Sequence, residues 1–254
     1  MKTLRLIAAA AALTAASMAP AMAQSTTFTN GSFDNATNNL SGWQSFGDVA
    51  VVGTRKMAAL TTASVLFEDD YPLAAGSNNL SGNAAIDFFT PGVNSLAGVS
   101  FAALDTVGNG FGLEGSAIRQ DFTATAGSTL TVRFDWAFLS ADTSKADFAF
   151  IAINDQVVKF TDAFSAPAVS NFTGTFGDFS QVNWGFTTTD FTYTATQNGA
   201  VSLVVGVVDL DGADLTSELR VDNFTVTAVP EPESYAMLLA GLGVMGAIAR
   251  RRRA

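Results

Sequence analysis

The chain contains neither cysteine nor histidine among its 254 residues. Without cysteine no disulfide can stabilise the fold, so stability has to come from a hydrophobic core, which a chain of this length can bury. Without histidine, Ser-His-Asp triads, Cys-His dyads and histidine-ligated zinc are excluded. Aspartates are plentiful, but spacing singles out no pair of carboxylates as a glycosidase pair. We therefore expect a protein that is not an enzyme.

Basic residues are scarce in the body of the chain. Residues 24–229 contain 21 acidic and 7 basic residues, and the whole chain has a net charge of −10. Such a surface repels nucleic acid and anionic membranes, so neither is an expected partner. Divalent cations and neutral polymers stay open as ligands. The plainer interpretation, that the acidity keeps the protein soluble, stays open as well.

Residues 1–23 have the pattern of a secretory signal peptide. Two basic residues give a positive start, residues 6–16 form an apolar, alanine-rich run, and small residues follow at the predicted cleavage site. We predict an N-terminal signal helix that signal peptidase removes between Ala23 and Gln24. The alternative, an amphipathic helix of the mature protein, lacks a polar face.

The last part of the chain has the pattern of a short anchor. Pro230-Glu231-Pro232 precedes an uncharged run from Tyr235 to Ala249, and four arginines follow: Arg250, Arg251, Arg252 and Arg253. As a helix this run would be roughly 22 Å long, shorter than the ~30 Å hydrocarbon core of a bilayer. Because arginines can snorkel and stay cytoplasmic, we predict a short, marginal membrane span with the body outside. The alternative is a buried core helix, which the terminal arginines disfavour.

Val229-Pro230-Glu231-Pro232, the apolar helix and the arginine cluster, in this order at the very end, resemble the PEP-CTERM sorting signal of Gram-negative bacteria. The resemblance covers residues 229–254 and implies recognition by an exosortase, a membrane protease-transpeptidase that cuts near the Pro-Glu-Pro motif. It implies export across the inner membrane, transient membrane insertion, and a final place at the cell surface or outside the cell. Such proteins accompany exopolysaccharide and biofilm production. The tail type is also named after ice-binding proteins.

Residues 24–228 are expected to form one β-sandwich domain. Over 129–137, apolar residues alternate with polar ones, which predicts a half-buried antiparallel strand. Residues 147–153 are apolar on both faces, which predicts a central strand. A turn is predicted at Ala126-Gly127, and hairpins at Asn154-Asp155 and Asn198-Gly199. Further strands are expected over 157–160, 186–193, 201–208 and 219–226, with weaker signals over 49–52, 64–67 and 84–89.

Many short strands with a hydrophobic interior predict an all-β fold, an antiparallel two-sheet sandwich or jelly roll, with no helix outside the two terminal signals. Three segments resemble the opening, middle and closing parts of jelly-roll carbohydrate-binding modules: Asn30-Gly31-Ser32-Phe33-Asp34 with Gly42-Trp43, Ile118-Arg119-Gln120-Asp121-Phe122, and Arg220-Val221-Asp222-Asn223-Phe224. The resemblance implies that the first and last strands are neighbours.

The same resemblance implies a structural calcium ion between these strands, on Asp34 and Asp222. Many relatives have two acidic residues near the front, where this chain has Ser32 and Asp34. In the alternative, Asp34 caps a turn and Asp222 is solvated.

A second candidate calcium site consists of Asp209, Asp211 and Asp214 around Gly212. The helix-loop-helix calcium pattern is incomplete because its final glutamate is missing. Asp211-Gly212 is equally consistent with a hairpin turn.

Sugar binding would need an exposed aromatic ring beside hydrogen-bonding groups. Trp43, Tyr71 and Trp184 lie in predicted loops or at their edges, so they are candidate ligand-binding residues. In the alternative, each ring covers the edge of the sandwich. Trp136 and Phe88-Phe89 are expected to pack inside.

Three functions of the body stay open. The first is that of a non-catalytic, polysaccharide-associated surface protein. The second is a purely structural or adhesive role in the envelope. The third is ice binding, suggested by threonine alternation at Thr123/Thr125 and Thr192/Thr194/Thr196, although these runs are short for a flat ice-binding face.

Overall fold

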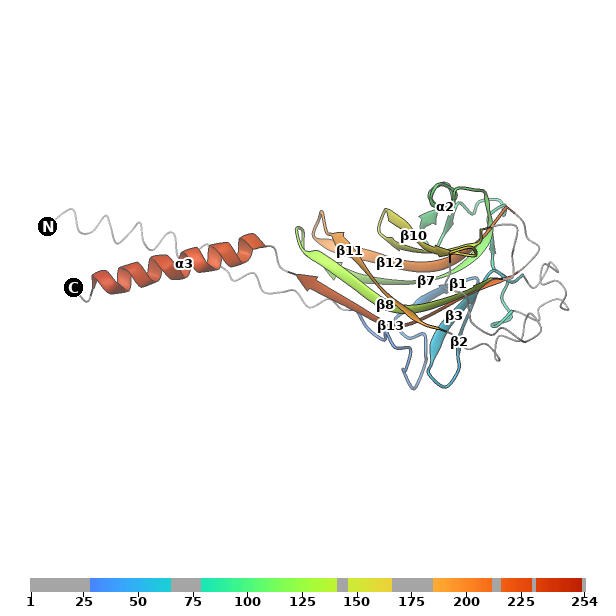
Figure 1. Cartoon of the computed structure of the whole chain (residues 1–254), viewed down its shortest axis with the longest axis horizontal. Helices are drawn as coiled ribbons and strands as arrows, with labels where there is room; N and C mark the ends of the chain where they lie inside the picture. Colours follow the sequence, from blue (N-terminus) through green and yellow to red (C-terminus); the bar gives the residue numbers. More distant parts are fainter. Residues whose placement is uncertain are drawn as a thin grey trace.

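Two antiparallel sheets face each other in the computed structural model, which describes residues 28–64, 79–140, 146–165, 185–211, 216–229 and 232–252 (Figure 1). The first sheet has the strand order β1 (Gln44–Phe46), β7 (Gly112–Ala124), β12 (Gly199–Leu210), β9 (Phe148–Ile153) and β10 (Gln156–Asp162), with β4 (Ile86–Asp87) also paired to β7. The second sheet has the order β11 (Thr187–Thr194), β8 (Thr129–Ser140), β13 (Ser217–Val229), β3 (Met57–Thr61) and β2 (Asp48–Val52). The predicted antiparallel sandwich is confirmed.

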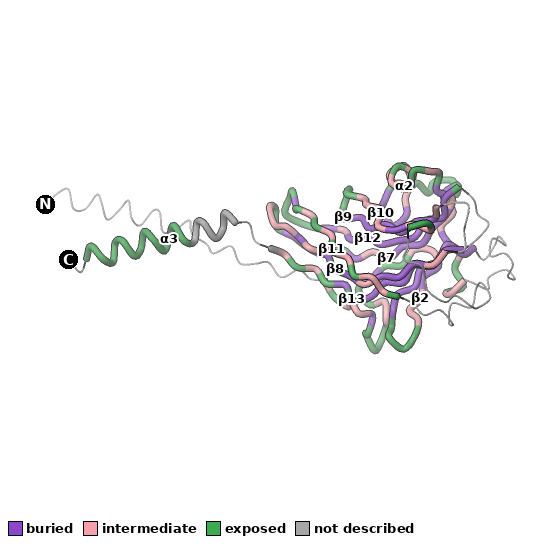
Figure 2. The backbone as a smooth tube through the Cα atoms, in the orientation of Figure 1, coloured by how far each residue is buried: buried purple, intermediate pink, exposed green. Residues whose placement is uncertain are grey.

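The main core lies between the two sheets and follows the predicted alternation. Along β8, Leu130, Val132, Phe134 and Trp136 are buried in this core, while Arg133 is exposed on the outer face. A strand whose side chains alternate between core and solvent in this way is half-buried. Figure 2 shows the buried residues concentrated where the sheets face each other.

Strand β9 is buried on both faces, as its continuous apolar sequence predicts. Ala149 and Ile151 point into the main core, whereas Phe148 and Phe150 point the other way into a second core. The second core lies under a cover made of Phe88, the two-stranded ribbon of β5 (Ser95–Leu96) and β6 (Val99–Ser100), and a helix. The first sheet is therefore covered on its outer face too, where a run without alternation is expected.

The covering helix, α2 (Phe101–Gly108), was not expected from the sequence. Its N-cap is Ser100, whose side-chain oxygen accepts a hydrogen bond from the Ala103 N–H, and its C-cap Asn109 is left-handed. Such caps satisfy helix ends locally. Phe101 stacks on Phe88 with ring centroids 3.9 Å apart, which anchors the helix to the sheet. At eight residues, α2 is stabilised by this packing more than by its propensity.

The Asn198-Gly199 turn is not the predicted hairpin. It joins β11 of the second sheet to β12 of the first, so it is an arch between the sheets. The Ala126-Gly127 turn makes a similar arch from β7 to β8, and the two arches are hydrogen-bonded: Ala126 N–H donates to Asn198 Oδ1 at 2.8 Å. Hairpin sequence signals fix a tight turn but not the pairing of its strands. The Asn154-Asp155 turn does form the predicted hairpin, between β9 and β10.

The first part of the chain follows the sequence signals less closely. Strand β2 matches the weak signal over 49–52, and the signal over 84–89 is reduced to β4. Strand β3 was not predicted, and the signal over 64–67 falls mostly outside the described residues.

The C-terminal helix α3 (Pro232–Arg251) extends away from the sandwich beyond the end of β13 (Figure 1). The predicted apolar run Tyr235 to Ala249 forms its middle, and Arg252 follows it. Within the described part of the chain, no helix combines the length and apolarity needed to cross a membrane. The signal segment 1–23, the cleavage site at Ala23 and Gln24, and Pro230, Glu231 and Arg253 lie outside the described residues.

Candidate functional site

Trp43, a predicted ligand-binding residue, is a core residue. It is 8% exposed, and its ring packs against Phe28, Phe33 and Phe224 with centroid separations of 5.6, 5.5 and 5.1 Å. Its indole N–H donates to the Asn30 carbonyl at 3.0 Å. A ring enclosed in this way cannot stack on a sugar, so the prediction for Trp43 is corrected. The other two candidates, Tyr71 and Trp184, lie outside the described residues.

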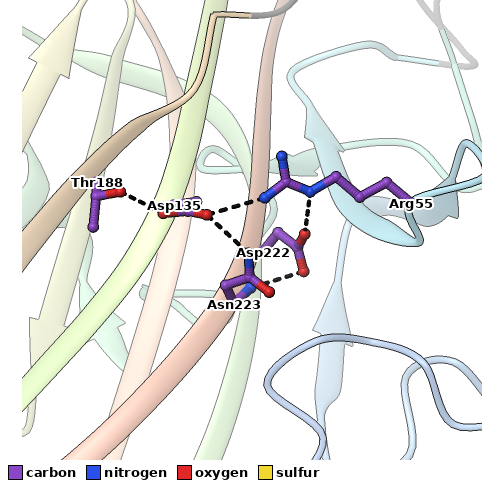
Figure 3. A network of polar contacts seen from close by, with 5 residues as sticks. All are labelled: Arg55, Asp135, Thr188, Asp222 and Asn223. Atoms are coloured by element: carbon purple, nitrogen blue, oxygen red, sulfur yellow. Dashed lines mark hydrogen bonds and ion pairs between the residues drawn. The ribbon is translucent and has the colours of Figure 1, made fainter.

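A polar network crosses the outer face of the second sheet (Figure 3). Arg55, in the turn between β2 and β3, donates from Nε to Asp222 at 2.8 Å and from a terminal nitrogen to Asp135 at 3.0 Å. Thr188 and Asn223 also donate to Asp135. One arginine thus connects the edge of the sheet to β13 and β8, through a bond to a buried carboxylate.

The pKa values of the two carboxyls in this network shift in opposite directions. Burial raises the pKa of Asp222, and the Asn223 backbone N–H and Arg55 offset this only in part. Burial also acts to raise the pKa of Asp135, but hydrogen bonds from Thr188 and Asn223, with the charge of Arg55, lower it below its ordinary value. The positive charge of Arg55 therefore matters most for keeping Asp222, the more deeply buried carboxylate, ionised.

The pair Asp34 and Asp222 does not fit a calcium ion. The predicted neighbourhood of the two segments is real, because Phe224 N–H donates to the Gly31 carbonyl at 2.9 Å. Asp34, however, is exposed, and Asp222 already has the guanidinium of Arg55 as its cation. Among the residues that the structure describes, no three acidic side chains are grouped so that they could hold a metal ion.

The second candidate calcium site is only partly described. Asp209 is buried on β12 opposite Glu114 of β7. Asp211 accepts a hydrogen bond from the Phe111 N–H at 2.9 Å. Asp214 lies outside the described residues. Calcium binding here stays a prediction.

A polar cavity of about 460 Å³ opens at the edge of the sandwich, where the β9–β10 turn meets the end of β11. We call it the edge cavity, and it is lined by Asp155, Gln156, Thr192, Tyr193, Thr194 and Thr196. A second hollow of about 370 Å³ adjoins it and shares Asp155, Tyr193 and Thr196. None of the residues that line either hollow is basic.

Tyr193 is the aromatic residue of the edge cavity, and its hydroxyl is held in a fixed direction. Asn154 Nδ2 donates to the Tyr193 hydroxyl at 2.9 Å. Asn154 is itself fixed, because its backbone N–H donates to the Ser202 carbonyl and its side-chain oxygen accepts from the Ser202 N–H, both at 2.9 Å. Asn154 has a left-handed φ of 54°, a conformation that asparagine tolerates at a tight turn.

The chemistry of the edge cavity suits an uncharged ligand rich in hydroxyl groups. Tyr193 offers part of an aromatic face, Thr196 offers a hydroxyl, and Asp155 and Gln156 offer a carboxylate and an amide. Thr192 and Thr194 line the cavity from strand β11, but they alternate with Tyr193, so their side chains lie on the outer face of the second sheet. The threonine alternation and the Asn154-Asp155 turn are visible in the sequence only as separate features. Tyr193 could not be predicted from them, because nothing local indicates that the turn and β11 meet across two sheets.

Threonines also form a regular array on the outer face of the second sheet, which we call the threonine face. Cross-strand pairing places Thr194 beside Thr129, and Thr192 beside Thr131, which is paired in turn with Thr227. Thr225 lies on the same face of β13, next to Arg133. The alternation seen in one strand therefore continues across β11, β8 and β13. On the first sheet, Thr123 pairs with Ala200, so the array does not extend from it there.

The C-terminal sorting motif is confirmed by comparison with known proteins. Residues 228–253 match the family description PEP-CTERM protein-sorting motif. A comparison with curated proteins finds no match. The matched segment is the tail alone, so it describes how the chain is sorted and not what the sandwich does.

Several solved structures resemble the fold at low identity. A CBM4 structure is 9% identical, with 74% of this chain and 96% of the other covered and a TM-score of 0.35. An arabinose-bound α-L-arabinofuranosidase is 7% identical, with 84% and 27% covered and a TM-score of 0.42. A cyclase from Fischerella sp. TAU is 13% identical, with 83% and 98% covered and a TM-score of 0.33. By its tail, the chain is an exported protein that carries the PEP-CTERM signal for exosortase sorting to the cell surface.

Proposed function

We propose that this protein is a non-catalytic, polysaccharide-associated protein of the Gram-negative cell surface. In this proposal, signal peptidase removes residues 1–23 and an exosortase cuts near Pro230-Glu231-Pro232 after transient insertion of the tail in the inner membrane. The sandwich is then delivered to the cell surface or released. The sorting motif supports the delivery, and the edge cavity supports polysaccharide binding.

The edge cavity carries the proposal because it combines concavity, an oriented aromatic residue and uncharged hydrogen-bonding groups. Asp155 is the only carboxylate among its lining residues. Glycoside hydrolysis needs two carboxylates on either side of the scissile bond, so these lining residues suit binding rather than cleavage. The acidic body of the chain and the absence of a basic lining residue favour a neutral polysaccharide over an anionic one.

The direct test is affinity electrophoresis of the purified protein in gels that contain neutral soluble polysaccharides, with alginate as an anionic comparison. Wild-type protein is expected to be retarded by at least one neutral polysaccharide. Tyr193→Ala should weaken that binding by about tenfold, the order of effect of one well-packed aromatic contact. Phe164→Ala is the matched control, because Phe164 is an exposed aromatic residue beyond the far end of β10.

Two results would count against the proposal. If no neutral polysaccharide retards the wild-type protein, with or without calcium, the structural or adhesive role becomes the better reading. If Tyr193→Ala binds as wild type, or if Phe164→Ala weakens binding as much as Tyr193→Ala does, the edge cavity is the wrong site. A melting temperature for each variant separates loss of binding from loss of fold.

The threonine face favours a second function, ice binding. Successive outward residues on a strand are about 6.6–6.8 Å apart, and neighbouring strands about 4.7–4.9 Å apart. Thr129, Thr131, Thr192, Thr194 and Thr227 therefore present hydroxyl and methyl groups on a two-dimensional lattice. The sequence argument against ice binding was the shortness of each run, and the neighbouring strands remove part of that objection.

Thermal hysteresis and ice-recrystallisation assays test this second function. Wild-type protein should exceed the buffer value, and Thr131→Glu, in the middle of the threonine face, should abolish the effect. Thr123→Glu on the first sheet is the matched control, because Thr123 is an exposed strand threonine outside the array. Hysteresis equal to that of buffer would remove ice binding.

A further inference from the structure

Two phenylalanines at one end of the first sheet are exposed beside each other. Phe89 is 60% exposed and Phe111 is 54% exposed, and their ring centroids are 5.7 Å apart. Phe89 follows β4 and Phe111 precedes β7, and the pairing of these two strands brings the rings together. We call them the phenylalanine pair. From the sequence, Phe89 was expected to pack inside with Phe88, but only Phe88 does so.

The segments that carry the phenylalanine pair are firmly held. Phe111 N–H donates to Asp211 Oδ1 and Asp211 N–H donates back to the Phe111 carbonyl, both at 2.9 Å. Phe89 N–H donates to Asp87 Oδ1 at 2.8 Å, and the adjacent Phe88 is stacked in the second core. The ordered backbone thus keeps both rings exposed to solvent, although exposed apolar surface of this kind is unfavourable. A rigid pair of exposed rings is pre-organised for a ligand.

The size of the phenylalanine pair argues against a protein partner. Two phenylalanines contribute about 300–500 Å² of surface at most, whereas a stable interface takes about 800 Å² from each partner. A second copy of the chain would need further apolar surface around the pair. Several neighbouring residues are acidic instead: Asp87 and Asp105 accept backbone hydrogen bonds, and Asp211 is exposed. These residues add no apolar surface to the pair.

The charge around the phenylalanine pair argues against anionic ligands. Residues 86–113 contain no lysine or arginine, and the carboxylates of Asp87 and Asp211 accept hydrogen bonds from the backbone N–H groups of Phe89 and Phe111. Anionic polymers and anionic lipid surfaces would be repelled. An uncharged ligand with one apolar face and hydroxyl groups around it suits both the rings and the acidic surroundings. The rings contact its apolar face, and the carboxylates accept hydrogen bonds from its hydroxyl groups.

We propose that the phenylalanine pair is a second polysaccharide-binding site, on which the apolar faces of neutral sugar rings stack. This inference rests on the proposed function and adds a place where the same class of ligand binds. The two sites lie near opposite ends of β12: Gly199 begins the strand near the edge cavity, and Leu210 ends it beside Asp211. At about 3.3 Å per residue the strand spans roughly 40 Å. Sites so far apart can engage one polymer twice or link two polymers, which raises avidity.

The test is affinity electrophoresis with a panel of neutral soluble polysaccharides: β-1,3-glucan, galactomannan and xyloglucan. The double variant Phe89→Ala/Phe111→Ala should bind about tenfold more weakly, as expected for loss of an aromatic contact. Phe89→Tyr/Phe111→Tyr should bind as wild type because the rings are kept. Phe164→Ala should also bind as wild type, since Phe164 is equally exposed, at 61%, but is not in the pair.

Comparison with Tyr193→Ala separates this inference from the proposed function. If wild type binds none of the polysaccharides, both fail. If Tyr193→Ala weakens binding and the double alanine variant does not, the phenylalanine pair is not a site and the edge cavity stands. If only the double alanine variant weakens binding, the pair stands and the edge cavity fails. Equal loss with Phe164→Ala, or loss with the tyrosine variant, would overturn ring stacking.

Melting temperatures accompany each variant. Because both rings are largely exposed, their removal should leave the melting temperature within a few degrees of wild type. If the double variant fails to fold, Phe89→Ala and Phe111→Ala singly carry the test, each with an expected loss of about threefold. Wild-type binding by both single variants would then overturn the inference.

Discussion

Arg55 has a central place in the polar network on the outer face of the second sheet. It bonds to carboxylates on β13 and β8, and its guanidinium lies 4.7 Å from the centroid of the Phe186 ring. Because Asp222 is buried and Arg55 is half-exposed, removal of Arg55 leaves a buried carboxylate without its countercharge.

We predict that Arg55→Ala lowers the free energy of unfolding by about 1–3 kcal/mol, discounted from a fully buried pair because Arg55 is partly solvated. Asp222→Asn in the Arg55→Ala background should recover part of the loss, since the buried charge is then gone. Urea unfolding of the two single variants and the double variant measures this coupling.

Arg133→Ala is the control for the Arg55 prediction. Arg133 also binds an aspartate, Asp190, at 3.3 Å, but both side chains are about half-exposed or more. Exposed ion pairs contribute about 0–1 kcal/mol, so this variant should be nearly neutral. An equally large loss for Arg133→Ala would show that burial of Asp222 is not the cause.

Glu218 gives a pH-dependent prediction. Burial raises the pKa of Glu218, and the charge of Asp48 adds to the rise, while Arg220, 2.6 Å away, opposes it. Because the folded-state pKa lies above the unfolded value, protonation of Glu218 stabilises the fold. This contribution is complete below the unfolded pKa of about 4.3 and is lost as pH rises through the folded pKa.

The measurement compares wild type with Glu218→Gln in urea unfolding from pH 7 to pH 4. Wild type should gain stability relative to the variant as pH falls. Asp162→Asn should give the opposite sign: burial alone would raise the pKa of Asp162, but hydrogen bonds from Ser165 and Lys159 lower it overall. The advantage of wild type over Asp162→Asn should therefore shrink as pH falls below about 4, the unfolded pKa of aspartate, so this comparison is extended to pH 2. Two differences with the same sign would contradict this assignment.

At the scale of elements, the opening segment of the body is joined to the last strand. Gly31 lies against Phe224, where β13 has an irregularity between Asp222 and Thr225 and Asn223 is left-handed. A Cβ at Gly31 would collide with the Phe224 carbonyl oxygen, so only glycine permits this approach.

Gly31→Ala should lower the free energy of unfolding by about 1–3 kcal/mol, since two backbones must separate and the Phe224–Gly31 hydrogen bond is strained. Gly185→Ala is the matched control, because no described atom lies within 4 Å of a Cβ there. Thermal unfolding of both variants suffices. Similar melting temperatures for the two variants would refute the close-approach argument.

Sequence patterns predicted the strands of this fold better than their partners. The alternation along β8 and the doubly apolar β9 specify how each strand is buried, because burial is a local property of the pattern. Pairing depends on residues far apart, so the Asn198-Gly199 arch resembled a hairpin. Helix α2 escaped prediction because one short helix is stabilised by contacts such as Phe88 with Phe101, which no local period indicates.

The candidate sites show the same division between local and long-range information. The tail was recognised because its motif, apolar run and arginines are contiguous in the sequence. The edge cavity joins the β9–β10 turn to β11, and the phenylalanine pair joins β4 to β7. Whether an aromatic residue in a predicted loop is exposed or buried depends on such contacts between elements far apart in the sequence. Trp43, which was expected to be exposed, therefore lies in the core, and Phe89, which was expected to be buried, is exposed.

At the scale of the whole molecule, the last strand of the sandwich ends just before Pro230-Glu231-Pro232. Strand β13 ends at Val229, which still pairs with Thr129 of β8. In α3, the described side chains from Leu239 onward are exposed apart from Gly241, and its large apolar residues include Leu239 at 68% and Met245 at 66% exposed. The fold therefore gains little burial from these α3 residues, while the helix carries an exposed apolar surface that favours association.

These features predict different melting temperatures for two truncations made only a few residues apart. A chain ending at Pro232 should keep the melting temperature of the full chain within a few degrees and elute as a smaller, less associated species in size-exclusion chromatography. A chain ending at Val226 loses the pairing of Thr227, Ala228 and Val229 with β8. The loss of these ladder hydrogen bonds should lower the melting temperature by about 4–8 °C or more. If the chain ending at Pro232 is the destabilised one, α3 is part of the fold, and removal of the tail by an exosortase would disrupt the protein that it delivers.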